Sequence, residues 1–239
     1  MGHLGSSGVI WGHLEKTDRL DAKVIAHYFA IKALQPMPLP SEKQRRLSAL
    51  SARMRQVVSD MTVQKQRLHS ASCDVSKSGL LELIGVLKRQ SKSLGKSLSA
   101  EIASLIAADP LWAKIDAVLR SVKGVAGRTV ATLMADLPEL GSLSNGAISK
   151  IVGVAPLADD SGKRPGIRRT CGGRAGVRSI LFLVADIVRK YDQSMSDFRD
   201  RLVAKGKKKM VIRIALAHKL LVRLNAKVRE VRAEHAKMT

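Results

Sequence analysis

The sequence predicts a mainly α-helical protein, and three observations support this class. The chain of 239 residues holds two Trp, two Tyr and three Phe, fewer aromatic residues than a β-sandwich or β-barrel usually needs. Apolar residues recur at steps of three and four over long stretches, which is the helical period. Proline is absent from residues 41–109, so nothing there interrupts a long helix.

Positive charge dominates the composition. The formal net charge is +22, which indicates a polyanionic partner and argues against an enzyme of small neutral metabolites. Residues 1–109 carry 16 basic and 9 acidic side chains, and residues 110–239 carry 26 and 11, so the second part should hold most of the polyanion-binding surface. The chain has no apolar run of the roughly 20 residues that a membrane span requires. Its two cysteines form no CxxC motif. We expect a cytoplasmic, nucleoid-associated protein without membrane contact.

The first element is a helix that begins near residue 18, within the sequence KTDRLDA at residues 16–22. Asp18 and Asp21 are three positions apart, so both carboxylates project from one face and could hold a divalent metal ion. The alternative is that they are ordinary acids at a helix N-terminus, where the helix dipole favours them. Prolines at positions 36, 38 and 40 then form an extended spacer.

Two long helices follow within residues 41–109. Ser41 and Gln44 form a predicted capping box, in which each side chain bonds the other's backbone amide. A polar break is expected around residues 70–78. The helices either fold back on each other or pair with another chain as a coiled coil, and we expect homo-oligomers through residues 41–105. The apolar positions of the first helix are Leu47, Leu50, Met54, Val57, Met61 and Leu68.

The last part starts at Asp109 and Pro110, an N-cap followed by proline at the first helical position. Helices are expected at about 110–121, 127–136, 144–152, 174–190, 195–205 and 207–232. The sequence VKGVAGRTVA at residues 122–131 resembles a helix-hairpin-helix motif, in which a glycine turn and the following helix N-terminus grip a DNA phosphate. Such motifs usually carry glycine where Ala126 stands, and the alternative is an ordinary corner between two helices. The predicted DNA-binding residues here are Gly124, Gly127, Arg128 and Thr129.

A basic loop precedes the helix expected at 174–190. From residue 163 to 178 the chain has six basic residues and no acid, and glycines would allow a bulky ligand to approach the backbone. Ser161 stands before these residues, which could stabilise charge at a phosphate that the serine attacks. No histidine is nearby in sequence to act as a base, which argues against a hydrolase triad. The alternative is a Ser-Gly turn beside a solvated basic loop. The predicted phosphate contacts are Lys163, Arg164, Arg168, Arg169, Arg174 and Arg178.

Taken in order, these motifs resemble one family, the bacterial insertion-element transposases with a RuvC-like DEDD domain, the one-ten group, to which Piv-type DNA invertases are related. The resemblance runs from about residue 14 to the C-terminus and rests on three stretches. They are KTDRLDAKVIA at 16–26, the hairpin sequence with LPELG at 137–141, and GVAP at 153–156 followed by DSG at 160–162 and GGR at 172–174.

The resemblance implies an RNase H-like domain with four metal-binding acids, a helical segment and a DNA-binding C-terminal domain. Asp18 and Asp21 would be the last two acids, with Mg²⁺ as the cofactor, and Ser161 would be the nucleophile that attacks DNA. Some family members use an RNA to choose their sites, so a guide RNA is a further expected partner. The implied domains are residues 1–40, a remnant of the catalytic domain with its spacer, the long helical hairpin or coiled coil at 41–109, and the transposase domain at 110–239.

One departure from the family pattern matters for activity. The residues before Lys16 are too few to form the sheet that carries the family's first two acids, so we expect an N-terminally truncated and impaired enzyme. Two other functions remain open at this point. One is a helix-hairpin-helix protein that binds DNA without cutting it. The other is a protein that dimerises with a full-length transposase and inhibits it.

Overall fold

The computed structural model describes residues 18–32, 41–156 and 170–238. These residues form nine α-helices and no strand, which confirms the predicted mainly α-helical class. The chain divides into two compact units, residues 1–40 and 41–239, and α2 (Asp18–Lys32) lies in the first. In the described parts of the chain, no helix is both long and apolar enough to cross a membrane. The second unit contains α3 (Glu42–Ser70), α4 (Asp74–Ala108), α5 (Pro110–Arg120), α6 (Gly127–Asp136), α7 (Asn145–Val152), α8 (Ala175–Val188), α9 (Gln193–Ala204) and α10 (Lys209–Met238).

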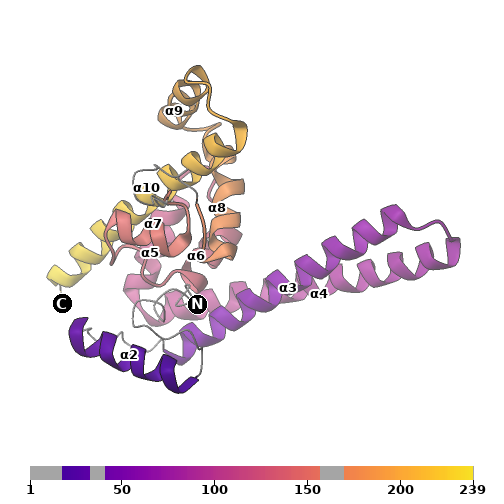
Figure 1. Ribbon diagram of the computed structural model, residues 1–239, viewed down its shortest axis with the longest axis horizontal. Helices are drawn as coiled ribbons and strands as arrows, with labels where there is room; N and C mark the ends of the chain where they lie inside the picture. The colour runs from indigo at the N-terminus through magenta and orange to yellow at the C-terminus, as the bar shows by residue number, and fades with distance from the viewer. Residues whose placement is uncertain (1–17, 33–40, 157–169, 239) are drawn as a thin grey trace. The chain divides into compact units, whose positions relative to one another are not determined.

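Helices α3 and α4 form a long antiparallel hairpin (Figure 1). Leu47 and Val57 of α3 are fully buried, so part of the predicted apolar seam is used within this chain. The expected polar break at 70–78 is wrong in length, because α4 already begins at Asp74. Asp74 is an acidic residue in the first turn of α4, where the helix dipole favours a negative charge. The polar residues from Asp74 onward therefore belong to the start of α4 and not to the connection between the two helices.

The start of α3 is capped as predicted, but Gln44 has an additional role. The Ser41 hydroxyl accepts a hydrogen bond from the Gln44 backbone amide at 3.2 Å, which confirms this half of the capping box. The Gln44 side-chain amide donates to the carbonyls of Met134 and Ala135, both at 2.9 Å. Gln44 therefore ties the base of the hairpin to the end of α6.

Two more residues of α3 join this connection. Ser48 Oγ donates to the Ala135 carbonyl at 2.6 Å, and Ser51 Oγ donates to Asp136 Oδ2 at 2.8 Å. Arg55 forms an ion pair with the same carboxylate. The last carbonyls of a helix lack partners within it, and here side chains of another helix supply the donors for them.

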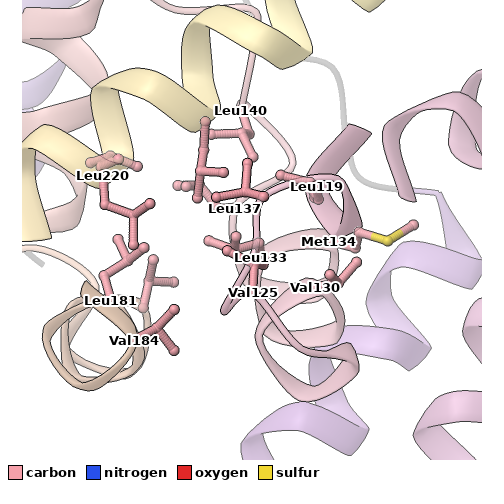
Figure 2. Packing of buried hydrophobic residues seen from close by; sticks show 14 of the residues in the cluster. Leu119, Val125, Val130, Leu133, Met134, Leu137, Leu140, Leu181, Val184 and Leu220 are labelled. Atoms are coloured by element: carbon pink, nitrogen blue, oxygen red, sulfur yellow. The ribbon is translucent and has the colours of Figure 1, made fainter. Parts of the chain in front are cut away.

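Helices α5 to α10 form a bundle around one apolar core (Figure 2). Helix α10 packs against α5, α7, α8 and α9, and so connects most of the bundle. Several leucines from four of these helices are fully buried, and each contributes about 2 kcal/mol to stability by leaving water. These residues are Leu119, Leu133, Leu181, Leu220, Leu221 and Leu224.

The expected helices of the bundle are present, and several of their ends differ by a few residues. Helix α9 begins at Gln193 rather than near 195, because the Asp192 side chain accepts a hydrogen bond from the Met195 amide at 3.1 Å and caps it. Helix α10 continues to Met238, beyond the expected end near 232. Arg232 donates to the carbonyls of Leu140 and Pro138 at 2.9 and 3.0 Å, which fastens the last turns to the bundle.

A buried asparagine holds the segment that joins α6 and α7. Asn225 of α10 is fully buried, and its Oδ1 accepts a hydrogen bond from the Gly141 amide at 2.8 Å. Its Nδ2 donates to the Leu143 carbonyl at 3.0 Å and to Asn145 Oδ1 at 2.9 Å. Gly141 has φ +82°, and a Cβ there would lie 2.7 Å from Val228 Cγ1. Only glycine fits this approach without a shift of the backbone.

Candidate nucleic-acid interface

The predicted hairpin turn lies between α5 and α6. Val122 and Val125 are buried and anchor the turn to the core. Gly124 has φ +98°, a conformation that glycine adopts at little cost, and a Cβ there would lie 3.1 Å from the backbone of Val188. The turn is therefore fixed against the end of α8, and its outer side is presented to solvent.

The N-terminus of α6 leaves two backbone donors available. Ala126 is the N-cap and makes no side-chain capping bond. The amides of Thr129 and Val130 donate back to the Ala126 carbonyl, whereas those of Gly127 and Arg128 have no acceptor in the described residues. Free amides at a helix start are suited to an anion. Ala126 has φ −90°, which explains how alanine can stand where related motifs carry glycine.

Three cationic residues belong to the helix end, the turn and the helix start that carry these amides. Lys123 and Arg128 are exposed. The guanidinium of Arg120 lies close to Gly127, with Nη1 3.3 Å from the position that a Cβ would take. A hydrogen bond to Asp116, 2.7 Å from Arg120 Nε, raises the pKa of Arg120 above its usual value. Arg120 was not among the predicted DNA-binding residues. The sequence did contain a signal for it, because Arg120 is a cation that stands one helical turn before Gly124.

Thr129 lies inside the bundle. The residue is 3% exposed, because the third residue of α6 faces the core. Its contact with DNA stays a prediction.

Arg174 and Arg178 have intramolecular partners. Arg174 donates to both carboxylate oxygens of Glu139, each at 2.5 Å, and to the Asp136 carbonyl at 2.8 Å. Arg178 bonds the Gly172 carbonyl. Both arginines thus position the backbone at the start of α8, and their contact with DNA stays a prediction.

The pair of Arg174 and Glu139 also has an electrostatic consequence. Partial burial acts to raise the pKa of Glu139, but the hydrogen bonds and the charge of Arg174, together with a backbone hydrogen bond, outweigh it, and the pKa lies below the usual value. The same hydrogen bonds raise the pKa of Arg174. Both groups are charged at neutral pH, so the pair holds α8 to the LPELG segment as an ion pair.

The turns that flank the predicted basic loop cross each other at close range. A Cβ on Gly173 would lie 2.5 Å from the backbone nitrogen of Gly153, and both glycines have positive φ. The Arg174 amide donates to the Ile151 carbonyl at 2.9 Å, across the same crossing. The predicted nucleophile and most predicted phosphate contacts lie outside the described residues. These are Ser161, Lys163, Arg164, Arg168 and Arg169.

Asp18 and Asp21 both lie in the first turn of α2, as predicted. Asp18 is exposed and Asp21 is half-buried. Among the described residues, no group of three or more His, Cys, Asp or Glu side chains is placed to hold a metal ion. Two carboxylates alone do not make a two-metal centre. The described residues therefore do not fit Mg²⁺ as a complete site.

Comparison with protein families gives two matches along the chain. Residues 11–71 match the DEDD transposase model of the IS110 group, described as "Transposase". Residues 116–200 match a model described as "Transposase IS116/IS110/IS902 family". The first match includes α2 and α3, and the second contains the hairpin turn, Arg174 and Arg178. A search of the curated proteins found no match. The two family matches show that the chain carries transposase domains of the IS110 family.

Proposed function

We propose that this protein is a DNA-binding transposase or site-specific recombinase of a bacterial insertion element, in which the turn between α5 and α6 holds a backbone phosphate of DNA. The observation that carries the DNA-binding proposal is the pair of unbonded amides at Gly127 and Arg128. The guanidinium of Arg120 lies close to Gly127, and Lys123 and Arg128 are exposed cations of the same segment. Amides and cations bind any phosphate alike, so this contact positions the duplex without reading its sequence.

The chemical step is assigned to Ser161. Its hydroxyl oxygen would attack a DNA phosphorus, forming a phosphoserine ester and releasing a sugar oxygen that takes up the proton. Support comes from the match of residues 116–200 to a transposase family and from the cationic residues predicted around the serine. The DEDD match suggests a divalent metal, with Asp18 and Asp21 as two ligands, but the residues described do not complete a site, and no step is assigned to the ion.

DNA binding is tested with the full chain and a short duplex, by fluorescence anisotropy at several salt concentrations. Changing Lys123→Gln and Arg128→Gln together should weaken binding to all sequences about equally, by roughly 10-fold, and reduce the salt slope by about 2. Lys88→Gln with Lys92→Gln removes the same charge from exposed positions of α4 and is the matched control. Equal affinity in the two double variants would contradict the role of the turn. RNA competitors in the same assay test the expected guide-RNA partner.

Strand cleavage is tested by trapping a covalent protein–DNA product. Ser161→Ala should abolish the product and leave DNA affinity within about twofold. A variant that still forms the adduct would overturn the assignment of the nucleophile. Tight DNA binding by the unmodified chain, with no adduct or strand exchange, would favour the non-catalytic DNA-binding function.

We also propose self-association through the α3–α4 hairpin. Leu50 is partly buried and Val57 is fully buried within this chain, so a second copy cannot pack against them. Exposed apolar side chains of α4 are available to it instead. Leu81, Leu83 and Val86 are 57%, 42% and 44% exposed. Leu83→Lys with Val86→Lys should reduce the mass found by analytical ultracentrifugation without loss of helicity. A monomeric unmodified protein would contradict this proposal.

A further inference from the structure

A cavity of about 510 Å³ opens between α8, α9 and α10. It is formed by residues that sequence analysis did not select, and none of them belongs to the hairpin turn. Its cationic lining residues come from the end of α8, from α9, and from the turn and first residues of α10. They are Arg189, Lys190, Arg199, Lys207, Lys209 and Arg213.

Acidic side chains neutralise only part of this charge. Asp186 is the one carboxylate in the lining, and its Oδ2 lies 2.8 Å from Arg213 Nε. Arg199 pairs with Asp200 at 2.7 Å. The other four cations of the lining have no carboxylate partner within the described residues. Cations gathered in a concave site raise the local potential well above that of a flat surface, so the cavity selects an anion.

Two donors of the lining arginines are unsatisfied. Arg189 Nε and Arg213 Nε are buried and make no hydrogen bond in the described residues, although Asp186 lies close to Arg213 Nε. A guanidinium with an unsatisfied donor favours an oxyanion beside it. Arginine presents its donors in a planar fork that matches phosphate oxygens.

The apolar side of the cavity narrows the choice of anion. Val203, Ile212 and Leu216 line it beside the cations. Arg213 lies over the ring of Phe182 at 4.0 Å, which holds this guanidinium as part of the wall. A cavity lined by both apolar and cationic side chains fits a phosphate attached to a sugar better than it fits a fully hydrated inorganic anion, since the sugar carbons can cover the aliphatic side chains.

The cavity and the turn between α5 and α6 both meet the C-terminal end of α8. A Cβ on Gly124 of the turn would lie 3.1 Å from the backbone of Val188, and the lining residues Arg189 and Lys190 follow Val188 directly. We propose that the cavity binds a backbone phosphate of a polynucleotide and so provides a second phosphate contact beside the turn. The inference rests on the proposed DNA-binding function for the identity of its ligand, and on the cavity alone for its selectivity for phosphate.

Two residues of the cavity can be changed without disturbing the core. Lys207 lies in the α9–α10 connection and Lys209 is the first residue of α10, and both are exposed, so Lys207→Gln with Lys209→Gln should preserve helicity and melting temperature. Lys88→Gln with Lys92→Gln is again the control for charge. In anisotropy measurements with duplex DNA and with single-stranded DNA, the cavity variant should bind about 10-fold more weakly than the control and show a salt slope smaller by about 2.

Inorganic phosphate and pyrophosphate serve as a second probe, independent of DNA. At about ten times its dissociation constant, pyrophosphate should raise the melting temperature of the unmodified protein and of the control by about 3 °C, and the cavity variant should lose this shift. Equal DNA affinity in the cavity variant and the control would overturn the polynucleotide assignment. If only the pyrophosphate shift is lost, the ligand is a small phosphate compound instead.

Failure of the proposed function gives a different pattern. If the unmodified chain binds no DNA, the DNA-binding proposal and the polynucleotide ligand both fail. A pyrophosphate shift that the cavity variant loses would still support a phosphate site in the cavity. An unmodified protein that neither binds DNA nor responds to phosphate would overturn the inference entirely.

Discussion

The α5–α10 bundle and the outer part of the hairpin, residues 61–90, are both helical but are stabilised in different ways. In the bundle, backbones approach each other closely at Gly124, Gly141 and Gly173, and side chains such as Asn225 satisfy buried backbone groups. The outer hairpin has two fully or nearly buried apolar residues on α4, Ile84 and Leu87. It also carries exposed apolar side chains, including Val75 at 80%.

This difference shows that helical content alone says little about stability. The bundle depends on close tertiary contacts that leave no space for an added atom, because moving densely packed backbone costs free energy. The outer hairpin depends on helix propensity and one narrow apolar seam, so single changes on its surface should matter little. Four substitutions, ordered from the largest expected effect to the smallest, test this contrast.

Gly173→Ala should have the largest effect. Its φ is +72°, and the added Cβ would lie 2.5 Å from the Gly153 nitrogen, so strain and overlap occur together. We expect a loss of at least about 3 kcal/mol in the free energy of unfolding, measured with urea. Gly146→Ala, in α7 with no atom within 4 Å of the new Cβ, is the control and should not destabilise. A stable Gly173→Ala variant would contradict the close crossing.

Asn225→Ala should cost about 2–3 kcal/mol, because the Gly141 amide and Leu143 carbonyl would lose their buried partner. Asn145→Ala removes only one of the three hydrogen bonds, at an exposed residue, and should cost about 0.5 kcal/mol. Urea unfolding of both variants gives the two values. If they are equal, the buried asparagine does not hold the α6–α7 connection as described.

Glu139→Gln should change the pH dependence of stability. The pKa of Glu139 is lowered in the folded protein, so its contribution is present above the unfolded value of about 4.5 and is lost as the pH falls through the folded value. Arg174 is partly exposed, so we expect on the order of 1 kcal/mol at pH 7. Melting temperatures from pH 7 to pH 3 should fall less steeply in the variant than in the unmodified protein.

The matched control for this pH experiment is in the outer hairpin. Asp74 pairs with Lys77 at 3.4 Å and is almost fully exposed, so Asp74→Asn should change the melting temperature at pH 7 less than Glu139→Gln does. If Glu139→Gln has the same pH profile as the unmodified protein, the ion pair with Arg174 does not stabilise the bundle.

Gly79→Ala should have the smallest effect and the opposite sign. Gly79 lies inside α4, and no atom is within 4 Å of a new Cβ, so alanine gains helix propensity without a clash. The gain should be about 0.5–1 kcal/mol. Thermal unfolding followed by circular dichroism measures it, and a lower melting temperature would show that the outer hairpin has contacts beyond its seam.

Sequence reasoning predicted the helices of the bundle well because their starts carry local signals. Asp109 before Pro110 was predicted as an N-cap, and the structure confirms its hydrogen bond to the Leu111 amide. The end of α10 was less predictable, because Arg232 stabilises it through carbonyls more than 90 positions away. Local signals define where a helix begins, whereas distant partners decide how far it continues.

The candidate site, like the helices, was predictable where local signals define it and not where packing does. The glycine turn follows from its sequence, but the orientation of Thr129 toward the core depends on the packing of α6 and could not be predicted. The cavity was missed for the same reason. Lys190, Arg199 and Lys207 belong to three separate segments, and only the packing of α8, α9 and α10 brings them together.

The central position of α10 has a consequence for synthesis of the chain on the ribosome. The two helices of the hairpin lie within residues 41–108 and are joined by three residues, so the hairpin can form while translation continues. The bundle cannot close until α10 emerges, since α10 covers α5, α7 and α8 and supplies the partner of Gly141. During that interval the apolar faces of α6 and α8 are exposed in the nascent chain, which makes this stage of synthesis the most vulnerable to aggregation and to chaperone capture.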